Sequence, residues 1–221
     1  MADAAALGAR AWPAVGSPTL VVPVGSCEQH GPHLPLDTDT RIAVALAMHL
    51  AAGDPATFVL APPLAVTASG EHAGFPGTLS LGVATTAAVL VELARSADWA
   101  AGVVYVNGHG GNTAALQRAS STLRSEGRRV LCWSPRIADG DLHAGHTETS
   151  LLLHLAPDVV DIAAAVAGPQ PALAELVDHG VRALSPTGVL GDPTRASAED
   201  GHRLFAELAE QLVRAVDAWR T

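Results

Sequence analysis

The chain has 221 residues, of which 48% are hydrophobic and 16% are charged, so a disordered chain is excluded and one domain over residues 1–221 is favoured. Its formal net charge is -9 with thirteen basic residues, which argues against a nucleic-acid-binding protein because phosphate contacts need a basic stripe. All thirteen are arginine, and the absence of lysine excludes mechanisms that depend on a lysine Schiff base or a P-loop lysine.

Short apolar runs alternate with helical patterns along most of the chain. Residues 19–24 predict a buried strand, and residues 39–52 predict a helix that ends at Gly53. The next elements, in chain order, are a strand (57–61), a helix (84–97), a strand (102–106), a helix that Asn112 would cap and Gly127 would end, a strand (129–133) and a short helix (147–155). Residues 157–198, rich in Pro and Gly, predict an irregular cover, and apolar residues at helical spacing from Leu204 to Trp219 predict a last helix.

Strands that alternate with helices indicate βαβ units, and therefore an α/β fold with a mostly parallel β-sheet flanked by helices. Ligands of such sheets bind beyond the carboxyl ends of the strands. Polar segments follow the strands at 19–24, 102–106 and 129–133, so we expect these segments to share one rim of the sheet.

Several features bear on the compartment in which the chain works. No apolar run approaches the roughly 20 residues of a membrane span, so we expect no membrane partner. The N-terminal segment MADAAALGARAW lacks the basic start and apolar block of a signal peptide. Cys27 and Cys132 form no CxxC pair, which is typical of a reducing cytosol. We therefore expect a cytoplasmic protein.

Ten histidines are unusual in a chain of this length, and several of them lie close to carboxylates. The clusters are Glu28-Gln29-His30 with Asp37 and Asp39 downstream, Gly70-Glu71-His72, Asn107 to Asn112 (NGHGGN), and His143 to Glu148 (HAGHTE). Histidine and carboxylate ligands without thiolates suit a hydrolytic zinc, manganese or iron centre. In an extended segment Glu28 and His30 would point the same way, whereas in a bent loop each could reach a different ion of a pair. Asp39, at a helix start, could bridge two ions.

Each of these residues also has a structural interpretation. A single histidine in a loop is commonly structural or exposed, Asp39 could stabilise a helix N-terminus through the dipole, and Asn112 could be a cap. Glu148 could stabilise the first turn of its helix, and Cys27, which could be a nucleophile, fits better as a small buried residue. Four histidine and carboxylate segments on one rim favour a metal site over these separate interpretations.

Four motifs carry a resemblance to a known family. The segments PVGSCEQHGPHLPLDTD, GEHAGFPGTLSLG, VNGHGGN and HAGHTETSLLLHLAP resemble the creatininase family of amidohydrolases, in order, over residues 20 to about 160. Within the family, LPLDTDTRIA, DLHAGHTETSLLLHL and TGVLGDPTRASAEDG resemble the mycofactocin branch, whose members are peptidases acting on a modified precursor peptide. The resemblance implies a creatininase-like α/β fold, a homo-oligomer and two divalent metal ions per subunit (zinc, iron or manganese).

The resemblance also implies the metal ligands. They are Glu28 and His109 on one ion, His30 on the other, Asp39 between them, and a further carboxylate on the second ion. Creatininase has that carboxylate two residues after the histidine that corresponds to His109. Gly111 stands there in this chain, so Glu148 is the expected replacement. The sequence also lacks a match to the tryptophan-bearing loop of creatininase, which argues against creatinine as the substrate.

Residues around the ions would complete the chemistry. His143 resembles the family's catalytic histidine and is the expected proton donor to the leaving amine, with His146 as the alternative. The remaining residues expected near the substrate or oxyanion are Gly110, Gly111, Glu71, His72 and His146. His33, between two prolines, is expected to be structural.

Three functions fit this pattern. The first is a peptidase that hydrolyses the modified precursor peptide and releases its C-terminal dipeptide, which derives from Val and Tyr. The second is an amidohydrolase of the same family that acts on a small cyclic amide or a formamide. The third, of a different class, is a non-catalytic metal-binding subunit.

Overall fold

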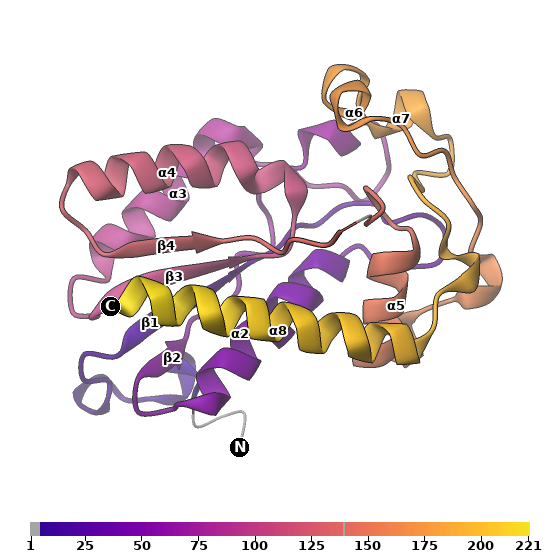
Figure 1. Ribbon diagram of the computed structural model, residues 1–221. Helices are drawn as coiled ribbons and strands as arrows, with labels where there is room; N and C mark the ends of the chain where they lie inside the picture. The colour runs from indigo at the N-terminus through magenta and orange to yellow at the C-terminus, as the bar shows by residue number, and fades with distance from the viewer. Residues whose placement is uncertain (1–4, 139) are drawn as a thin grey trace.

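The computed structural model describes residues 5–138 and 140–221, and its centre is a parallel sheet (Figure 1). In the part of the chain described, the sheet has four strands in the order β2-β1-β3-β4. They are β1 (Thr19–Val24), β2 (Phe58–Leu60), β3 (Gly102–Asn107) and β4 (Val130–Trp133). All neighbouring pairs are parallel, and Val24 at the end of β1 lies opposite Asn107 at the end of β3. The predicted α/β fold with a parallel sheet is confirmed.

Helices cover both faces of this sheet (Figure 1). Helices α2 (Thr38–Gly53) and α8 (Ala198–Arg220) pack on one face, and α3 (Gly82–Ser96) and α4 (Thr113–Ser125) pack on the other. Helix α5 (His146–Leu155) lies against α8, beyond the carboxyl ends of the strands. Among the described residues, no helix combines the length and hydropathy that a membrane span requires.

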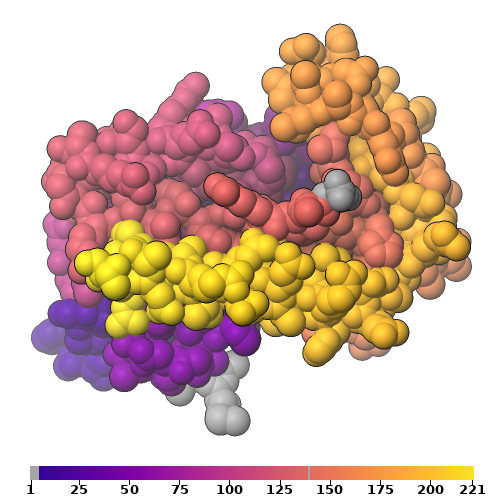
Figure 2. Space-filling view, in the orientation of Figure 1, coloured from indigo at the N-terminus to yellow at the C-terminus, as the bar shows by residue number. Residues whose placement is uncertain are grey.

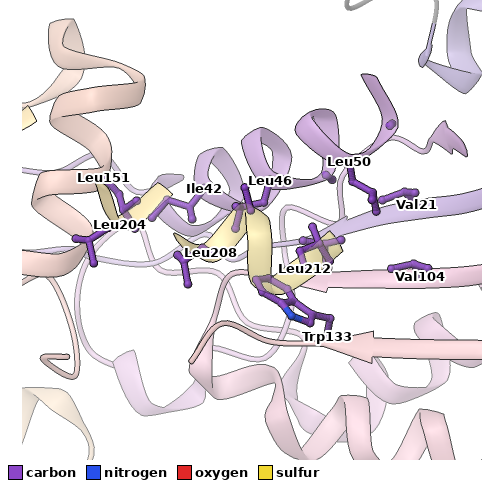
Figure 3. Close-up of a cluster of buried hydrophobic side chains, with 14 of the residues drawn as sticks. Val21, Ile42, Leu46, Leu50, Val104, Trp133, Leu151, Leu204, Leu208 and Leu212 are labelled. Atoms are coloured by element: carbon purple, nitrogen blue, oxygen red, sulfur yellow. The ribbon is translucent and has the colours of Figure 1, made fainter. Parts of the chain in front are cut away.

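Alternation along the strands divides the core into two layers. Val21 and Val104 point toward α2 and α8, where Leu46, Leu208 and Leu212 meet them (Figure 3). Their neighbours along the strands, such as Val22 and Tyr105, point to α3 and α4. Because both faces are covered, β1 and β3 are buried at every residue, which explains why they read as continuous apolar runs.

The predicted element bounds hold within a few residues, with two corrections. The stretch 157–198 is not wholly irregular, because it contains α6 (Leu173–His179) and α7 (Val181–Leu184), separated by Gly180 at φ 72°. Short 3-10 turns account for several other segments: Leu7–Ala9, Trp12–Ala14, Gly70–His72, Gly110–Asn112, Pro157–Val159, Ile162–Ala164 and Pro193–Arg195.

The second correction concerns Asn112, which precedes α4 but does not cap it through its side chain. Its amide nitrogen donates to the carbonyl of Gly25 at 3.0 Å, and its amide oxygen accepts from the backbone N–H of Ala68 at 3.2 Å. Asn112 therefore joins the segments that follow β1, β2 and β3, and α4 begins from a 3-10 turn instead.

Candidate metal centre

The predicted ligands come together beyond the carboxyl ends of β1 and β3. The chain winds from β1 to β2 on one side and then to β3 and β4 on the other, so the strand order reverses between β1 and β3. Such a switch point leaves a crevice in open parallel sheets. The segments after β1 and β3 supply Glu28, His30 and His109, the first turn of α2 supplies Asp39, and the start of α5 supplies Glu148.

One group of potential ligands consists of Glu28, Asp39 and His109, all buried. Nδ1 of His109 lies 3.0 Å from Oδ2 of Asp39, and Nε2 of His109 lies 3.1 Å from Oε2 of Glu28. The Ser26 hydroxyl donates to Oδ2 of Asp39 at 2.8 Å and so helps to orient this carboxylate. One ligand atom from each of the three residues lies within 4.8 Å of the others, which is close enough to hold one cation.

A second group consists of His30, His143 and Glu148. Nε2 of His30 lies 3.1 Å from Oδ1 of Asp39 and 3.8 Å from Oε2 of Glu148. Nδ1 of His30 donates to the carbonyl of Glu28 at 3.0 Å, so Nε2 faces the two carboxylates, where it could bind an ion once its proton is lost. Asp39 thus presents one oxygen to each group, as a bridging ligand would.

The Glu28 carboxylate tests whether a cation fits. Both of its oxygens are buried and, within the described residues, neither has a hydrogen-bond partner. Ring nitrogens of His72 and His109 approach to 3.2 Å and 3.1 Å without the alignment of a hydrogen bond. Burial first, and the nearby Asp39 charge next, raise the pKa of Glu28 to about 8 against the opposing effect of His109. A cation between these groups would compensate the carboxylate, and nitrogen and oxygen donors without thiolates suit zinc, manganese or iron.

Without a metal ion, protonated histidines supply the positive charge beside these carboxylates. Burial by itself would lower the pKa of His30, but the adjacent Asp39 carboxylate raises that pKa to about 10. Glu28 and Asp39 likewise hold the pKa of His109 well above its ordinary value despite burial. His30 and His109 keep the pKa of Asp39 well below its ordinary value. Metal ions would therefore have to displace protons on binding.

His143 lies beside both groups with its ring held in one tautomer. Its Nε2–H donates to the carbonyl of Gln29 at 2.8 Å, which leaves Nδ1 as the free nitrogen. Nδ1 lies 3.9 Å from Oε1 of Glu28 and 4.0 Å from Oε2 of Glu148. Burial, and then the positive charge on His30, hold the pKa of His143 well below its ordinary value. The ring is therefore neutral, with a lone pair directed between the two groups.

Gln29 organises this side of the site, although the sequence indicated no role for it. Its side-chain amide donates to Nδ1 of His72 at 2.9 Å and to the carbonyl of Gly188 at 3.3 Å. A glutamine amide nitrogen only donates, so Nδ1 of His72 accepts and the Nε2–H of His72 faces Glu28. A Cβ at Gly188 would lie 1.8 Å from the amide oxygen of Gln29, so only glycine fits there.

Glu71 occupies the space beside Gly111. A Cβ at Gly111 would lie 2.0 Å from Oε1 of Glu71 and 2.4 Å from Nε2 of His109, so no side chain fits at this position. Oε1 of Glu71 lies 3.2 Å from Nε2 of His109, and the Glu71 side chain is 25% exposed. Gly110, by contrast, is exposed and has open space at its Cβ position.

Some of the predicted residues lie apart from this cluster. Nε2 of His146 faces Asp200 of α8 at 3.5 Å, so the structure does not bring this ring to the carboxylates. Nε2 of His33 contacts the Thr149 hydroxyl at 2.8 Å, a buried contact that joins the segment after β1 to α5. Asp37 pairs with Arg41 at 2.7 Å near the surface.

Comparisons with known proteins show which family this chain resembles. The Creatininase family model, described as creatinine amidohydrolase, matches residues 9–216. The curated mycofactocin precursor peptide peptidase of Mycolicibacterium smegmatis is 52% identical over 213 residues, which cover 92% of this chain and 86% of the relative. Creatinine amidohydrolase of Pseudomonas putida is 29% identical over 84% of this chain and 78% of the relative. A solved creatininase variant of Zn-Zn type has a TM-score of 0.78 at 25% identity and covers 96% of each chain.

Proposed function

The chain belongs to the creatininase family of hydrolases that act on C–N bonds, and we propose that it is a dinuclear metal peptidase acting on the modified mycofactocin precursor peptide. It would release the C-terminal dipeptide derived from Val and Tyr. The observation that carries the proposal is the 52% identity to a peptidase of that name over 92% of the chain. The buried and uncompensated Glu28 carboxylate supports a metal centre independently of that likeness.

Five residues would hold the two ions. Glu28, Asp39 and His109 would bind the first, and His30, Asp39 and Glu148 would bind the second. Glu148 is fixed by the backbone N–H of Ala144, which donates to its Oε2 at 2.6 Å. When bound, a pair of divalent ions activates water for attack and polarises the amide carbonyl. Zinc, iron and manganese all suit these ligands.

His143 would move the proton that amide hydrolysis requires. Its neutral Nδ1 can accept a proton from the attacking water and pass it to the leaving nitrogen of the substrate. The Gln29 carbonyl holds the opposite Nε2–H, so the ring keeps Nδ1 toward the site throughout. General acid–base catalysis of this kind contributes about 10²–10⁴-fold in rate.

Backbone amides complete the catalytic surface that we propose. The 3-10 turn Gly110–Asn112 follows His109 directly and begins with two glycines, so its backbone can approach a substrate closely. The N–H groups of Gly110 and Gly111 would donate to the oxygen that becomes negatively charged during the reaction. Glu71 and His72 would shape the pocket, because both side chains surround His109 and Glu28.

A second candidate is an amidohydrolase that acts on a small cyclic amide or a formamide. The 29% identity to creatinine amidohydrolase over 84% of the chain favours it. Mass spectrometry on the modified precursor peptide separates the two candidates. With metal-loaded protein we expect the mass of the peptide to fall by that of its C-terminal dipeptide. An unchanged peptide, under conditions in which a lactam or formamide is hydrolysed, would reject the peptidase.

Three broader proposals accompany this function. Residues 1–221 form a single domain, and the two core layers that share one sheet support this. The protein forms a homo-oligomer, which the resemblance to its family supports. It works in the cytoplasm, and the two cysteines support a reducing compartment because neither is in a disulfide.

A further inference from the structure

A groove runs along the open edge of the sheet, between α4 and β4. It encloses about 710 Å³, and Ser120, Arg124, Cys132 and Arg136 are among the residues that line it. β4 is the last strand in the sheet order, so one of its edges has no neighbouring strand. In Figure 2 the segment that contains β4 forms part of the surface between α4 and α8, although no residue of β4 is highly exposed. An unpaired strand edge beside a groove can accept an extended peptide.

One residue of β4, Cys132, brings its backbone to this groove. The N–H of Val103 on β3 donates to the carbonyl of Arg129 at 3.0 Å, which sets the register between the two strands. In a parallel pair, alternate residues direct their backbone groups to the neighbour. The backbone groups of Leu131 and Trp133 therefore face β3, and those of Val130 and Cys132 point away from it; of these two residues, Cys132 lines the groove and Val130 is buried.

The groove is positively charged in a chain whose net charge is -9. Arg124 and Arg136 line it, and no Asp or Glu is among its lining residues. Within the described part of the chain, neither guanidinium has a carboxylate within 4.0 Å, whereas Arg95 and Arg128 are paired with acids. Gln211 of α8 donates to the carbonyl of Arg136 at 2.9 Å and so anchors its backbone.

The groove leads to the candidate metal centre. A second cavity of about 230 Å³ shares Pro135 with the groove and is lined by Gly110 and Glu148. The Thr113 hydroxyl, on the groove side, donates to the carbonyl of Gly110 at 2.7 Å and joins the two walls. The groove and the cavity beside Glu148 are therefore adjacent.

We propose that this groove binds the part of the peptide substrate N-terminal to the scissile bond, as an extended acidic segment paired with β4. The proposal rests on the peptidase function proposed above. Because the released piece is only a dipeptide, the longer remainder of the substrate needs its own path away from the metal centre. Arg124 and Arg136 would recognise carboxylates of that segment, and the outward backbone groups of Cys132 would bind its backbone.

Equilibrium binding tests the groove without requiring cleavage. The probe is a short fluorescein-labelled peptide with two aspartates, and its counterpart has asparagines at the same positions. Fluorescence anisotropy with metal-loaded protein should show tighter binding of the aspartate peptide. The combined variant Arg124→Gln, Arg136→Gln should weaken that binding about five- to thirtyfold. Arg118→Gln is the matched control, because Arg118 lies on α4 outside the groove, and it should bind as the unaltered protein does.

Two results would contradict the proposed binding groove. In the first, the double variant binds the aspartate peptide as tightly as the unaltered protein does. In the second, Arg118→Gln loses as much affinity for that peptide as the double variant. A parallel assay of precursor-peptide cleavage distinguishes failure of the groove from failure of the proposed peptidase function. If the protein binds the aspartate probe through its arginines but cleaves no peptide, the groove stands and the peptidase function fails. If the double variant cleaves the precursor with unchanged KM, the groove fails and the function stands.

Discussion

Replacing Glu28 by glutamine should stabilise the metal-free protein and destabilise the metal-loaded one. Glu28 is fully buried, and its two oxygens have no hydrogen-bond partner within the described residues. Its pKa rises from an ordinary 4.5 to about 8 in the fold, mainly through burial. A raised pKa on an acid means that stability is complete below the ordinary pKa and is lost as the pH rises toward the raised value.

The size of the effect follows from this shift. At about pH 7 the folded protein must keep a proton on Glu28 that the unfolded chain has lost, at a cost of about 3 kcal/mol. Glutamine has nearly the same shape and no charge, so it removes this cost. It also introduces an amide that needs new hydrogen bonds, and the net gain should be about 1–3 kcal/mol. The gain should vanish near pH 4.5 and be complete above about pH 8.

Urea unfolding of chelator-treated protein at several pH values measures this difference. Adding a divalent ion at about 1,000 times its dissociation constant should then stabilise the unaltered protein by about 4.1 kcal/mol and reverse the order of the two proteins. The reasoning is refuted if metal-free Glu28→Gln is less stable than the unaltered protein at about pH 7. It is refuted equally if the ion stabilises both proteins by the same amount.

Four further predictions concern the neighbouring residues. His143→Ala should retain both ions by elemental analysis but lose about 10²–10⁴-fold in kcat, and full activity would exclude His143 as the proton carrier. Glu148→Gln should bind about one ion per chain instead of about two, and unchanged stoichiometry would exclude Glu148 as a ligand. Ion binding at about pH 7 should release protons, because His30 has a pKa of about 10 without metal. Calorimetry in buffers of different ionisation enthalpy should detect this release. The affinity for the ion should also fall as the pH falls. His33→Ala should cost about 1–3 kcal/mol of stability with kcat nearly unchanged, because the ring is buried and its polar contact is with Thr149 rather than with a proposed metal ligand.

The parallel sheet and the place of the site could be predicted because a few strong patterns determine them. Strands buried on both faces must be apolar throughout, so the runs at 19–24 and 102–106 could be recognised as strands. Their carboxyl ends then indicated the edge of the sheet at which the site lies. Glu28, His30 and His109 follow those runs directly, so their convergence required only a parallel sheet.

Other features depend on tertiary contacts that local patterns do not reveal. His143 and His146 are three residues apart, but His143 precedes α5 and lies beside Glu148, whereas His146 begins α5 and faces Asp200. The sequence alone does not show where this helix begins. Gln29 lies between two predicted ligands, yet its role depends on contacts with His72 and Gly188, far along the chain. Helices α6 and α7 were missed because prolines and glycines around them resemble an irregular segment.

The rate of peptide hydrolysis as a function of bound ions tests the central claim most directly. Chelator-treated protein would be titrated with zinc, iron or manganese, and each sample would be assayed on the modified precursor peptide by mass spectrometry. We expect almost no cleavage up to about one ion per chain and a rise to the full rate at about two, because both ions act on the same amide. Full activity with one ion per chain, or cleavage that persists in the chelator-treated protein, would contradict a dinuclear metal peptidase.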